Sequence, residues 1–90
     1  MYVDYAGYRY PVATERFIIG RSRKECDLAI ADTNVSRQHA LVEWFNGCFH
    51  IVDMGSTNGI EFNGQRVYRR IIRDGDVFHI AGHELRFGFG

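Results

Sequence analysis

The sequence predicts an all-β protein, a two-sheet β-sandwich of about ten to eleven short strands. Three observations support this prediction: polar and apolar residues alternate, hairpin dipeptides separate apolar runs, and no window keeps a helical period. The clearest alternation covers residues 83–89 and places Leu85, Phe87 and Phe89 on one face. Turn signals recur about every 8–12 residues, which is typical of a sandwich or barrel.

Five strands are predicted in the first half of the chain, where short runs are rich in β-branched and aromatic residues. They cover Tyr2 to Tyr5, Tyr8 to Val12, Arg16 to Ile19, Asp27 to Ile30 and Ala40 to Phe45. Ala6-Gly7 closes a first hairpin between the first two runs. Pro11 lacks a backbone N–H, so its strand is expected at a sheet edge.

Five more strands are predicted in the second half: Cys48 to Asp53, Ile60 to Phe62, Gln65 to Tyr68, Asp76 to Ala81 and His83 to Phe89. Asn46-Gly47 and Asn63-Gly64 each lie between apolar runs. These dipeptides are strong hairpin signals because type I′ turns require positive φ at both central residues. Asp74-Gly75-Asp76 predicts a further turn.

The composition suits one folded domain. Ninety residues, 46% of them hydrophobic and 14% aromatic, provide enough material for one core. We see no linker, repeat or low-complexity segment, and we expect a single domain over residues 1–90 that is a module of a longer protein.

The charge balance excludes partners that bind through bulk electrostatics. Eleven basic and eleven acidic residues cancel, so neither a nucleic acid nor an anionic membrane is expected as a partner. Basic residues do crowd two predicted loops: Arg21, Arg23 and Lys24 in one, and Arg66, Arg69, Arg70 and Arg73 in the other. We interpret the second group as a solvated face.

The cysteines and the N-terminus point to an intracellular protein, cytoplasmic or, in a eukaryote, nuclear. Cys26 and Cys48 lack a metal-like spacing and are expected to be reduced, small core residues, although an even count leaves a disulfide open. No apolar run approaches ~20 residues, and no basic-then-apolar signal-peptide pattern begins the chain.

Three polar clusters at the ends of predicted strands are the most informative feature. They are Gly20-Arg21-Ser22, Ser36-Arg37-Gln38-His39 and Ser56-Thr57-Asn58-Gly59. Loops at strand ends gather at one pole of a β-fold, so we expect these clusters to meet. Arginine forks, hydroxyls, an amide and backbone N–H groups together suit a phosphate dianion on a peptide.

Each candidate residue contributes a specific donor. Arg21 offers a planar cationic fork, Ser36 a hydroxyl, and Arg37 a side chain or a backbone N–H. Thr57 adds a hydroxyl, and the Asn58 amide can hold a peptide group at two atoms. Taken singly, each also fits an ordinary loop or turn residue, and only their combination indicates a site.

Enzyme and metal functions are disfavoured, and we expect no catalytic residue, metal or cofactor. Ser36, His39 and Asp53 have the residue types of a triad, but no nucleophile-elbow motif surrounds Ser36. His79 and His83 are four residues apart, but Ala81-Gly82 between them signals a turn, so a core or surface histidine pair is expected in place of a metal pair on a helix. A role for His39 in hydrogen bonding to loop backbone is favoured over catalysis.

The order and spacing of four segments resemble the forkhead-associated (FHA) domain family. The segments are Phe17 to Ser22, Val35 to Ala40, Asp53 to Gly59 and Phe62-Asn63-Gly64, and the resemblance covers about residues 15–90. It implies an eleven-stranded β-sandwich with binding loops at one end. It also implies recognition of phosphothreonine in proteins, without catalysis, by a signalling module.

The resemblance assigns a role to each matching residue. Arg21, Ser36 and Arg37 resemble the phosphate-binding residues, Thr57 resembles the residue that shapes the threonine methyl pocket, and Asn58 the one that holds the peptide main chain. Gly20, His39 and Gly59 resemble residues that support the loops. The implied partner is a protein or peptide phosphorylated by a Ser/Thr kinase, with Asn34, Arg23, Lys24 and the stretch after Gly59 as selectivity candidates. A phosphate-independent assembly domain is the alternative, and the oligomeric state stays open.

Overall fold

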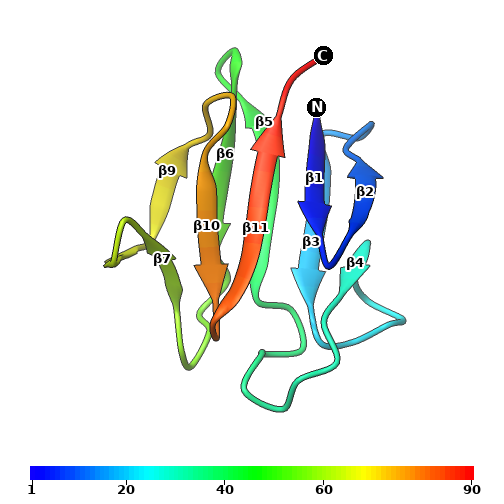
Figure 1. Cartoon of the computed structure of the whole chain (residues 1–90), viewed down its shortest axis with the longest axis vertical. Coiled ribbons are helices and arrows are strands. Elements are labelled where there is room, and N and C mark those ends of the chain that lie inside the picture. The colour runs from blue at the N-terminus through cyan, green and yellow to red at the C-terminus, as the bar shows by residue number, and fades with distance from the viewer.

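The computed structural model describes all 90 residues and contains eleven strands in two sheets (Figure 1). The six strands of the first sheet are β1 (Tyr2–Tyr5), β2 (Tyr8–Pro11), β7 (Ile60–Phe62), β8 (Gln65–Val67), β10 (Val77–Ile80) and β11 (His83–Gly88). The five strands of the second are β3 (Arg16–Gly20), β4 (Leu28–Ala29), β5 (Ala40–Phe45), β6 (Cys48–Asp53) and β9 (Arg69–Ile71). The predicted all-β sandwich is confirmed.

The strand order leaves short strands at the sheet edges. The first sheet runs β2-β1-β11-β10-β7-β8, and the second runs β4-β3-β5-β6-β9. Pro11 therefore lies on an edge strand, as its missing N–H requires. The chain forms no helix that is long and apolar enough to cross a membrane.

The core lies between the two sheets and contains 16 buried hydrophobic residues. Leu85 and Phe87 of β11 are fully buried, as the alternation predicts. Phe89 is an exception, with 42% of its surface exposed. It follows the end of β11, and its backbone N–H donates to the Asp74 carboxylate at 2.9 Å instead of extending the sheet.

The hairpin turns follow their local chemistry. Asn46 and Asn63 have φ of 56° and 51°, and the glycines that follow them also have positive φ. These values match type I′ turns, so the Asn-Gly prediction is confirmed. The same geometry closes the β10–β11 hairpin at Ala81-Gly82.

The structure contains one strand, β9, that is not among the ten predicted strands. β9 spans an arginine pair and one isoleucine, and it pairs with β6 in the second sheet, whereas β8 pairs with β7 in the first. The chain thus changes sheet at Tyr68. The arginines predicted to crowd one loop are consequently divided, with Arg66 on β8 and with Arg69 and Arg70 on β9.

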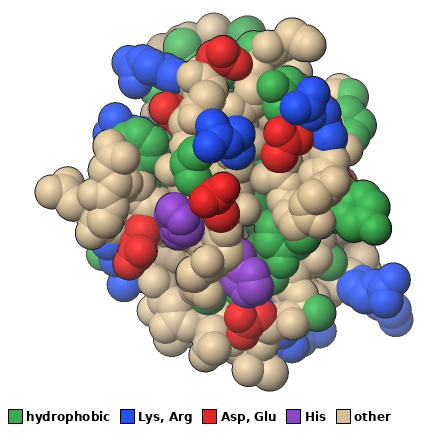
Figure 2. Space-filling view, in the orientation of Figure 1, with side chains coloured by type: hydrophobic (Ala, Val, Ile, Leu, Met, Phe, Trp, Pro, Cys, Tyr) green, Lys and Arg blue, Asp and Glu red, His purple; other side chains and the backbone are tan.

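The three polar clusters lie in the β3–β4, β4–β5 and β6–β7 connections. These connections gather at the end of the sandwich opposite both termini (Figure 1). On the face that Figure 2 shows, acidic, basic and histidine side chains are interspersed and form no large patch of one sign. The sandwich therefore brings the candidate residues together at one pole.

Candidate functional site

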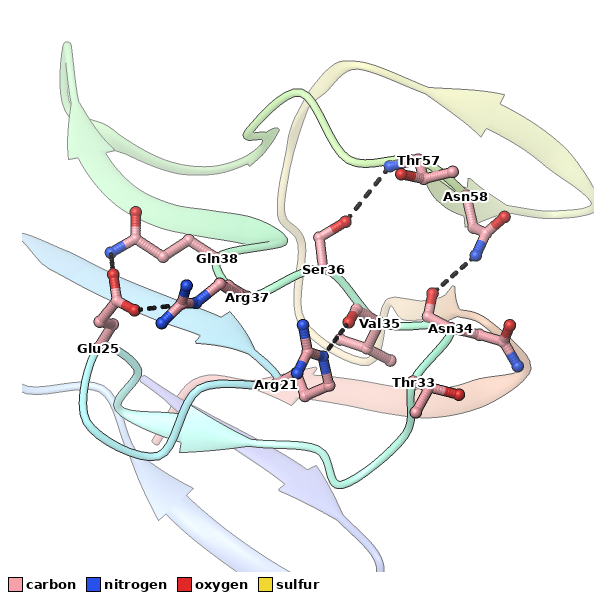
Figure 3. Close-up of a pocket in the computed structure, with 10 residues that line it drawn as sticks. All are labelled: Arg21, Glu25, Thr33, Asn34, Val35, Ser36, Arg37, Gln38, Thr57 and Asn58. Carbon is pink, nitrogen blue, oxygen red and sulfur yellow. Dashed lines mark hydrogen bonds and ion pairs between the residues drawn. The ribbon is translucent and has the colours of Figure 1, made fainter.

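A cavity of about 690 Å³ opens between the three loops at this pole (Figure 3). It contains all five residues that the sequence predicts as ligand contacts, and its ten lining residues are Arg21, Glu25, Thr33, Asn34, Val35, Ser36, Arg37, Gln38, Thr57 and Asn58. Only Val35 among them is hydrophobic. Such a lining suits a polar or charged ligand.

Arg21 directly follows β3, and its guanidinium is held at one edge. Its Nε donates to the carbonyl of Val35 at 3.1 Å, and its backbone N–H donates to the carbonyl of Ser36 at 2.9 Å. Because Nε is occupied, the two terminal nitrogens are the donors left for a ligand. A guanidinium with two such donors can bind two phosphate oxygens at once.

Ser36 and Thr57 connect the second loop to the third. The backbone N–H of Thr57 donates to the Ser36 hydroxyl oxygen at 3.3 Å. A serine hydroxyl that accepts one hydrogen bond still has its own proton to donate. In Figure 3 the Ser36 side chain lies between Arg21 and Thr57, so its proton can reach an anion held by Arg21.

The Arg37 side chain is paired within the protein. Its Nε lies 3.4 Å from a Glu25 carboxylate oxygen, and Gln38 donates to the other oxygen at 3.3 Å. In Figure 3 the guanidinium turns toward Glu25 and away from Thr57. The backbone N–H of Arg37 donates no hydrogen bond within the protein. Of the two donors that the sequence predicts for Arg37, the backbone group is the one left open.

Asn58 ties the third loop to the second and keeps further capacity for a ligand. Its Nδ2 donates to the carbonyl of Asn34 at 2.7 Å. The amide oxygen and the second amide proton remain for a ligand. Asn34 is itself held, because its backbone N–H donates to Asp32 at 2.8 Å.

Asp32 connects this loop to the β10–β11 hairpin. His83 Nε2 lies 2.7 Å from its second carboxylate oxygen, and His83 Nδ1 lies 3.2 Å from the Tyr5 hydroxyl. The Asn34 N–H and, next, the His83 ring hold the pKa of the Asp32 carboxyl below its ordinary value. A contact chain thus runs from β1 to the binding loops.

His39 is fully buried and forms hydrogen bonds with backbone groups through both ring nitrogens. The Ser36 N–H donates to Nδ1 at 3.0 Å, so Nε2 carries the proton that it donates to the Gly59 carbonyl at 2.8 Å. Asp53 instead accepts from the Ser56 N–H and hydroxyl. Ser36, His39 and Asp53 therefore do not form a triad, and the loop-supporting role predicted for His39 fits this geometry.

Two glycines allow close backbone approach. A Cβ at Gly20 would overlap the Arg37 carbonyl, so glycine there lets the first two loops meet. Gly59 has φ of 78°, and a Cβ on it would overlap the Arg66 guanidinium. A larger residue at either position would therefore create a steric overlap, and the supporting roles implied for both glycines stay predictions.

Sequence reasoning missed the group that braces the third loop. Ser56 is 7% exposed, and its hydroxyl accepts the Gly59 N–H at 2.9 Å while it donates to Asp53. Arg66 reaches this loop from β8, with one terminal nitrogen 3.3 Å from the Ser56 carbonyl and 3.8 Å from Asp53. An Asp three residues before a Ser is a recognisable turn signal. No local signal marks Arg66.

The structure also places the remaining cysteines and histidines. Cys26 and Cys48 are free but only partly buried, so their predicted place in the core is wrong. Cys26 lies beside the site, 3.0 Å from the Arg37 carbonyl, and burial raises the pKa of its thiol. His79 and His83 flank the β10–β11 turn, and no group of three or more metal-ligating side chains occurs.

A protein-family model and curated proteins match most of this chain. The family model "FHA domain" matches residues 17–81. The oxoglutarate dehydrogenase inhibitor of Corynebacterium diphtheriae is 33% identical over 85 residues, which cover 88% of this chain and 59% of that protein. The chain thus spans somewhat over half the length of that relative.

Two solved structures share the fold. EmbR of Mycobacterium tuberculosis, in complex with a low-affinity phosphopeptide, is 30% identical with a TM-score of 0.89, and the match covers 97% of this chain and 24% of EmbR. A domain from work on phosphothreonine-dependent FHA interactions is 28% identical with a TM-score of 0.86, and the match covers 100% of this chain and 98% of that domain. With the family model matching most of its length, the chain belongs to the FHA domain family.

Proposed function

We propose that this FHA domain is a non-enzymatic reader of phosphothreonine that recruits proteins phosphorylated by a Ser/Thr kinase. One observation carries the proposal: the free guanidinium nitrogens of Arg21 and the hydroxyl proton of Ser36 converge on one polar cavity. Two acidic oxygens of a phosphate dianion match these donors. The phosphopeptide bound by the related EmbR structure supports the same use of the fold.

The peptide main chain is assigned to the third loop. Asn58 keeps an acceptor and a donor after bonding to Asn34, and a peptide group offers the complementary pair. Arg37 contributes its backbone N–H to the phosphate, while Glu25 holds its side chain. Gly20, His39 and Gly59 keep the three loops in register.

The absence of catalysis is part of the proposal. Both ring nitrogens of His39 bind backbone groups, so His39 is not available as a base for Ser36. Curated relatives include an oxoglutarate dehydrogenase inhibitor of Corynebacterium diphtheriae and the glycogen accumulation regulator GarA of Mycobacterium tuberculosis. We also propose that the domain is an intracellular module of a longer protein, which agrees with two free cysteines and longer relatives.

Binding to matched peptides tests the function. An oriented library of phosphothreonine peptides selects a ligand, and calorimetry then compares that ligand with its unphosphorylated form. We expect binding only with phosphate, because the charge-assisted hydrogen bonds of the cavity need the anion. Equal affinity for the two forms would support the phosphate-independent assembly alternative instead.

A further inference from the structure

His83 is the first residue of β11, and its ring contacts Asp32, which lies 51 positions away in the β4–β5 connection. In Figure 1 the β10–β11 turn lies at the same end of the sandwich as this connection. His83 does not line the first cavity, the one between the three binding loops. It lines a separate cavity of about 450 Å³ beside the β1–β2 and β10–β11 turns. An effect of His83 on a ligand in the first cavity must therefore pass through other residues.

The proton on the His83 ring can be assigned from its two partners. The Asn34 N–H and, next, the ring itself hold the pKa of the Asp32 carboxyl below its ordinary value, so Asp32 is ionised at neutral pH and can only accept hydrogen bonds. Nε2, at 2.7 Å from this carboxylate, is therefore the nitrogen that donates. Nδ1 of the neutral ring then accepts from the Tyr5 hydroxyl at 3.2 Å. With both nitrogens bonded, the ring holds the carboxylate from a fixed position.

Asp32 fixes the turn formed by residues 32–35. Its other carboxylate oxygen accepts the Asn34 N–H at 2.8 Å, and its backbone carbonyl accepts the Val35 N–H at 3.0 Å. An aspartate that binds the N–H two residues further on stabilises a local turn. The carboxylate is thus bonded on one side to this turn and on the other side to His83.

The turn presents two carbonyls to residues that are proposed to contact the ligand. The Asn34 carbonyl accepts from Asn58 Nδ2 at 2.7 Å, and the Val35 carbonyl accepts from Arg21 Nε at 3.1 Å (Figure 3). Both bonds orient the donors that Asn58 and Arg21 keep free for a ligand. Groups of a binding site need to be held to within about 0.5 Å by the residues that support them. A displacement of the turn would therefore weaken two ligand contacts at once.

We propose that His83 is a positioning residue of the phosphopeptide site, which acts on Arg21 and Asn58 through Asp32 and the turn of residues 32–35. The inference rests on the proposed function. His83 contacts no ligand, and its effect comes from keeping the Asp32 carboxylate in place for the Asn34 N–H. A hairpin outside the three binding loops thereby contributes to affinity.

Calorimetry with one phosphothreonine peptide tests the proposal. His83→Leu makes neither ring hydrogen bond, and we expect affinity to fall about fivefold, a modest loss because solvent weakens a partly exposed pair. The His83 side chain is 30% exposed, so this variant should fold, which thermal unfolding checks. His83→Gln should recover most of the loss, since its amide nitrogen can donate to Asp32 in place of Nε2.

His79→Leu is the matched control, because it removes a histidine from the same hairpin. The His79 ring lies 3.9 Å from Glu84 on the neighbouring strand and lines no cavity. This variant should bind the phosphopeptide with the affinity of the wild type.

A double-mutant cycle tests whether His83 acts through Asn58. Asn58→Ala removes the amide that the Asn34 carbonyl holds, so His83→Leu should cost only about twofold in that background, because residues in one chain of bonds have non-additive effects. The remaining loss comes through Arg21. In the free domain, the NMR signals of the Asn58 side-chain amide should move in His83→Leu and stay in place in His79→Leu.

The wild-type domain gives a readout that needs no variant. The ¹⁵N shifts of the His83 ring report which nitrogen carries the proton, and we expect Nε2 to carry it at neutral pH. A ring whose only proton is on Nδ1 would overturn the proposal, because Nε2 could not then donate to Asp32.

Three further results would overturn the positioning role: full affinity in folded His83→Leu, equal losses in His83→Leu and His83→Gln, or unmoved Asn58 amide signals. The proposed function fails separately, if the wild type binds the peptide equally with and without phosphate. In that case the Asn58 signals of the free domain still decide whether His83 positions the loop.

Discussion

A buried hydrogen bond of 2.8 Å joins His39 Nε2 to the carbonyl of Gly59. His39 directly precedes β5, at the end of the second loop, and Gly59 lies in the third loop. The two residues are 20 positions apart in sequence. Because the other ring nitrogen accepts the Ser36 N–H, one side chain sets the distance between a phosphate donor and the β6–β7 loop. The shape of the cavity thus depends on a residue that does not line it.

His39→Ala should reduce both stability and ligand affinity. The substitution leaves a backbone N–H and a carbonyl without partners in the interior, which costs about 1–3 kcal/mol each. We expect the free energy of unfolding to fall by about 2–6 kcal/mol, as measured by urea denaturation. His39→Gln can restore one of the two bonds and should lose less. An Ala variant as stable as the wild type would refute the supporting role.

Gly20→Ala should damage the site for steric reasons alone, because Gly20 does not have positive φ and its Cβ would overlap the Arg37 carbonyl. Gly55→Ala is the control, since φ there is 73° but no atom lies within 4 Å of the added carbon. The control should lose about 1 kcal/mol of stability through backbone strain and keep its affinity. Gly20→Ala should lose affinity as well, and calorimetry with one phosphopeptide compares the two.

Arg21→Ala should weaken phosphopeptide binding at least about tenfold, because a charge-assisted hydrogen bond contributes roughly 1.5–3 kcal/mol. Arg21→Lys should also lose much of the affinity, since an ammonium cannot reproduce the fork. Arg73→Ala removes the same charge from an exposed arginine that lines no cavity, and it should bind normally. Full affinity in a folded Arg21→Ala protein would refute the assignment of Arg21 as a phosphate-binding residue.

The stability of the fold at acidic pH should depend on the ionised carboxylate of Asp32. Its pKa is lowered in the folded state, so its ionised form stabilises the fold above the ordinary value of 3.8, and this contribution disappears as the pH falls through the folded value. We expect urea stability of the wild type to drop more steeply than that of Asp32→Asn between about pH 5 and pH 2. Glu61→Gln changes an exposed carboxylate and should follow the wild type. If urea stability fell equally with pH in the wild type and in Asp32→Asn, the proposed contribution of ionised Asp32 to stability would be contradicted.

Phosphothreonine should bind about tenfold more tightly than phosphoserine in otherwise identical peptides. Burying the extra methyl stabilises the complex by roughly 0.8 kcal/mol, and the stiffer χ1 of threonine reduces the entropy lost on binding. The methyl should lie near Thr57 and Val35, the single hydrophobic residue in the first cavity. Competition binding with the two peptides measures the ratio. Equal affinities would refute the predicted methyl pocket but would leave the proposed phosphate-binding residues unaffected.

Local sequence signals account for most of the fold. The alternation of residues 83–89 and the Asn46-Gly47 and Asn63-Gly64 dipeptides specify strands and turns through the chemistry of neighbouring residues. The three polar clusters could be placed together from the sequence because each follows or precedes a strand, and strand ends meet at one pole of a sandwich.

Contacts between distant segments could not be predicted in this way. The strand β9 consists of two arginines and one isoleucine, and its place in the second sheet depends on pairing with β6. Glu25 decides where the Arg37 side chain turns, and Arg66 braces a loop from a different strand. Tyr10 of β2 and Ala29 of β4, which belong to different sheets, line one cavity together with Arg21.

The sequence by itself therefore determined ten of the eleven strands, the turns and the set of donors that meet at one pole. Only the tertiary structure decided which donors stay open to a ligand and which are used within the protein. The physical reason is that strand and turn preferences act over a few residues, whereas the orientation of Arg37, the support of Gly59 and the lining of a cavity depend on packing between segments far apart in the chain.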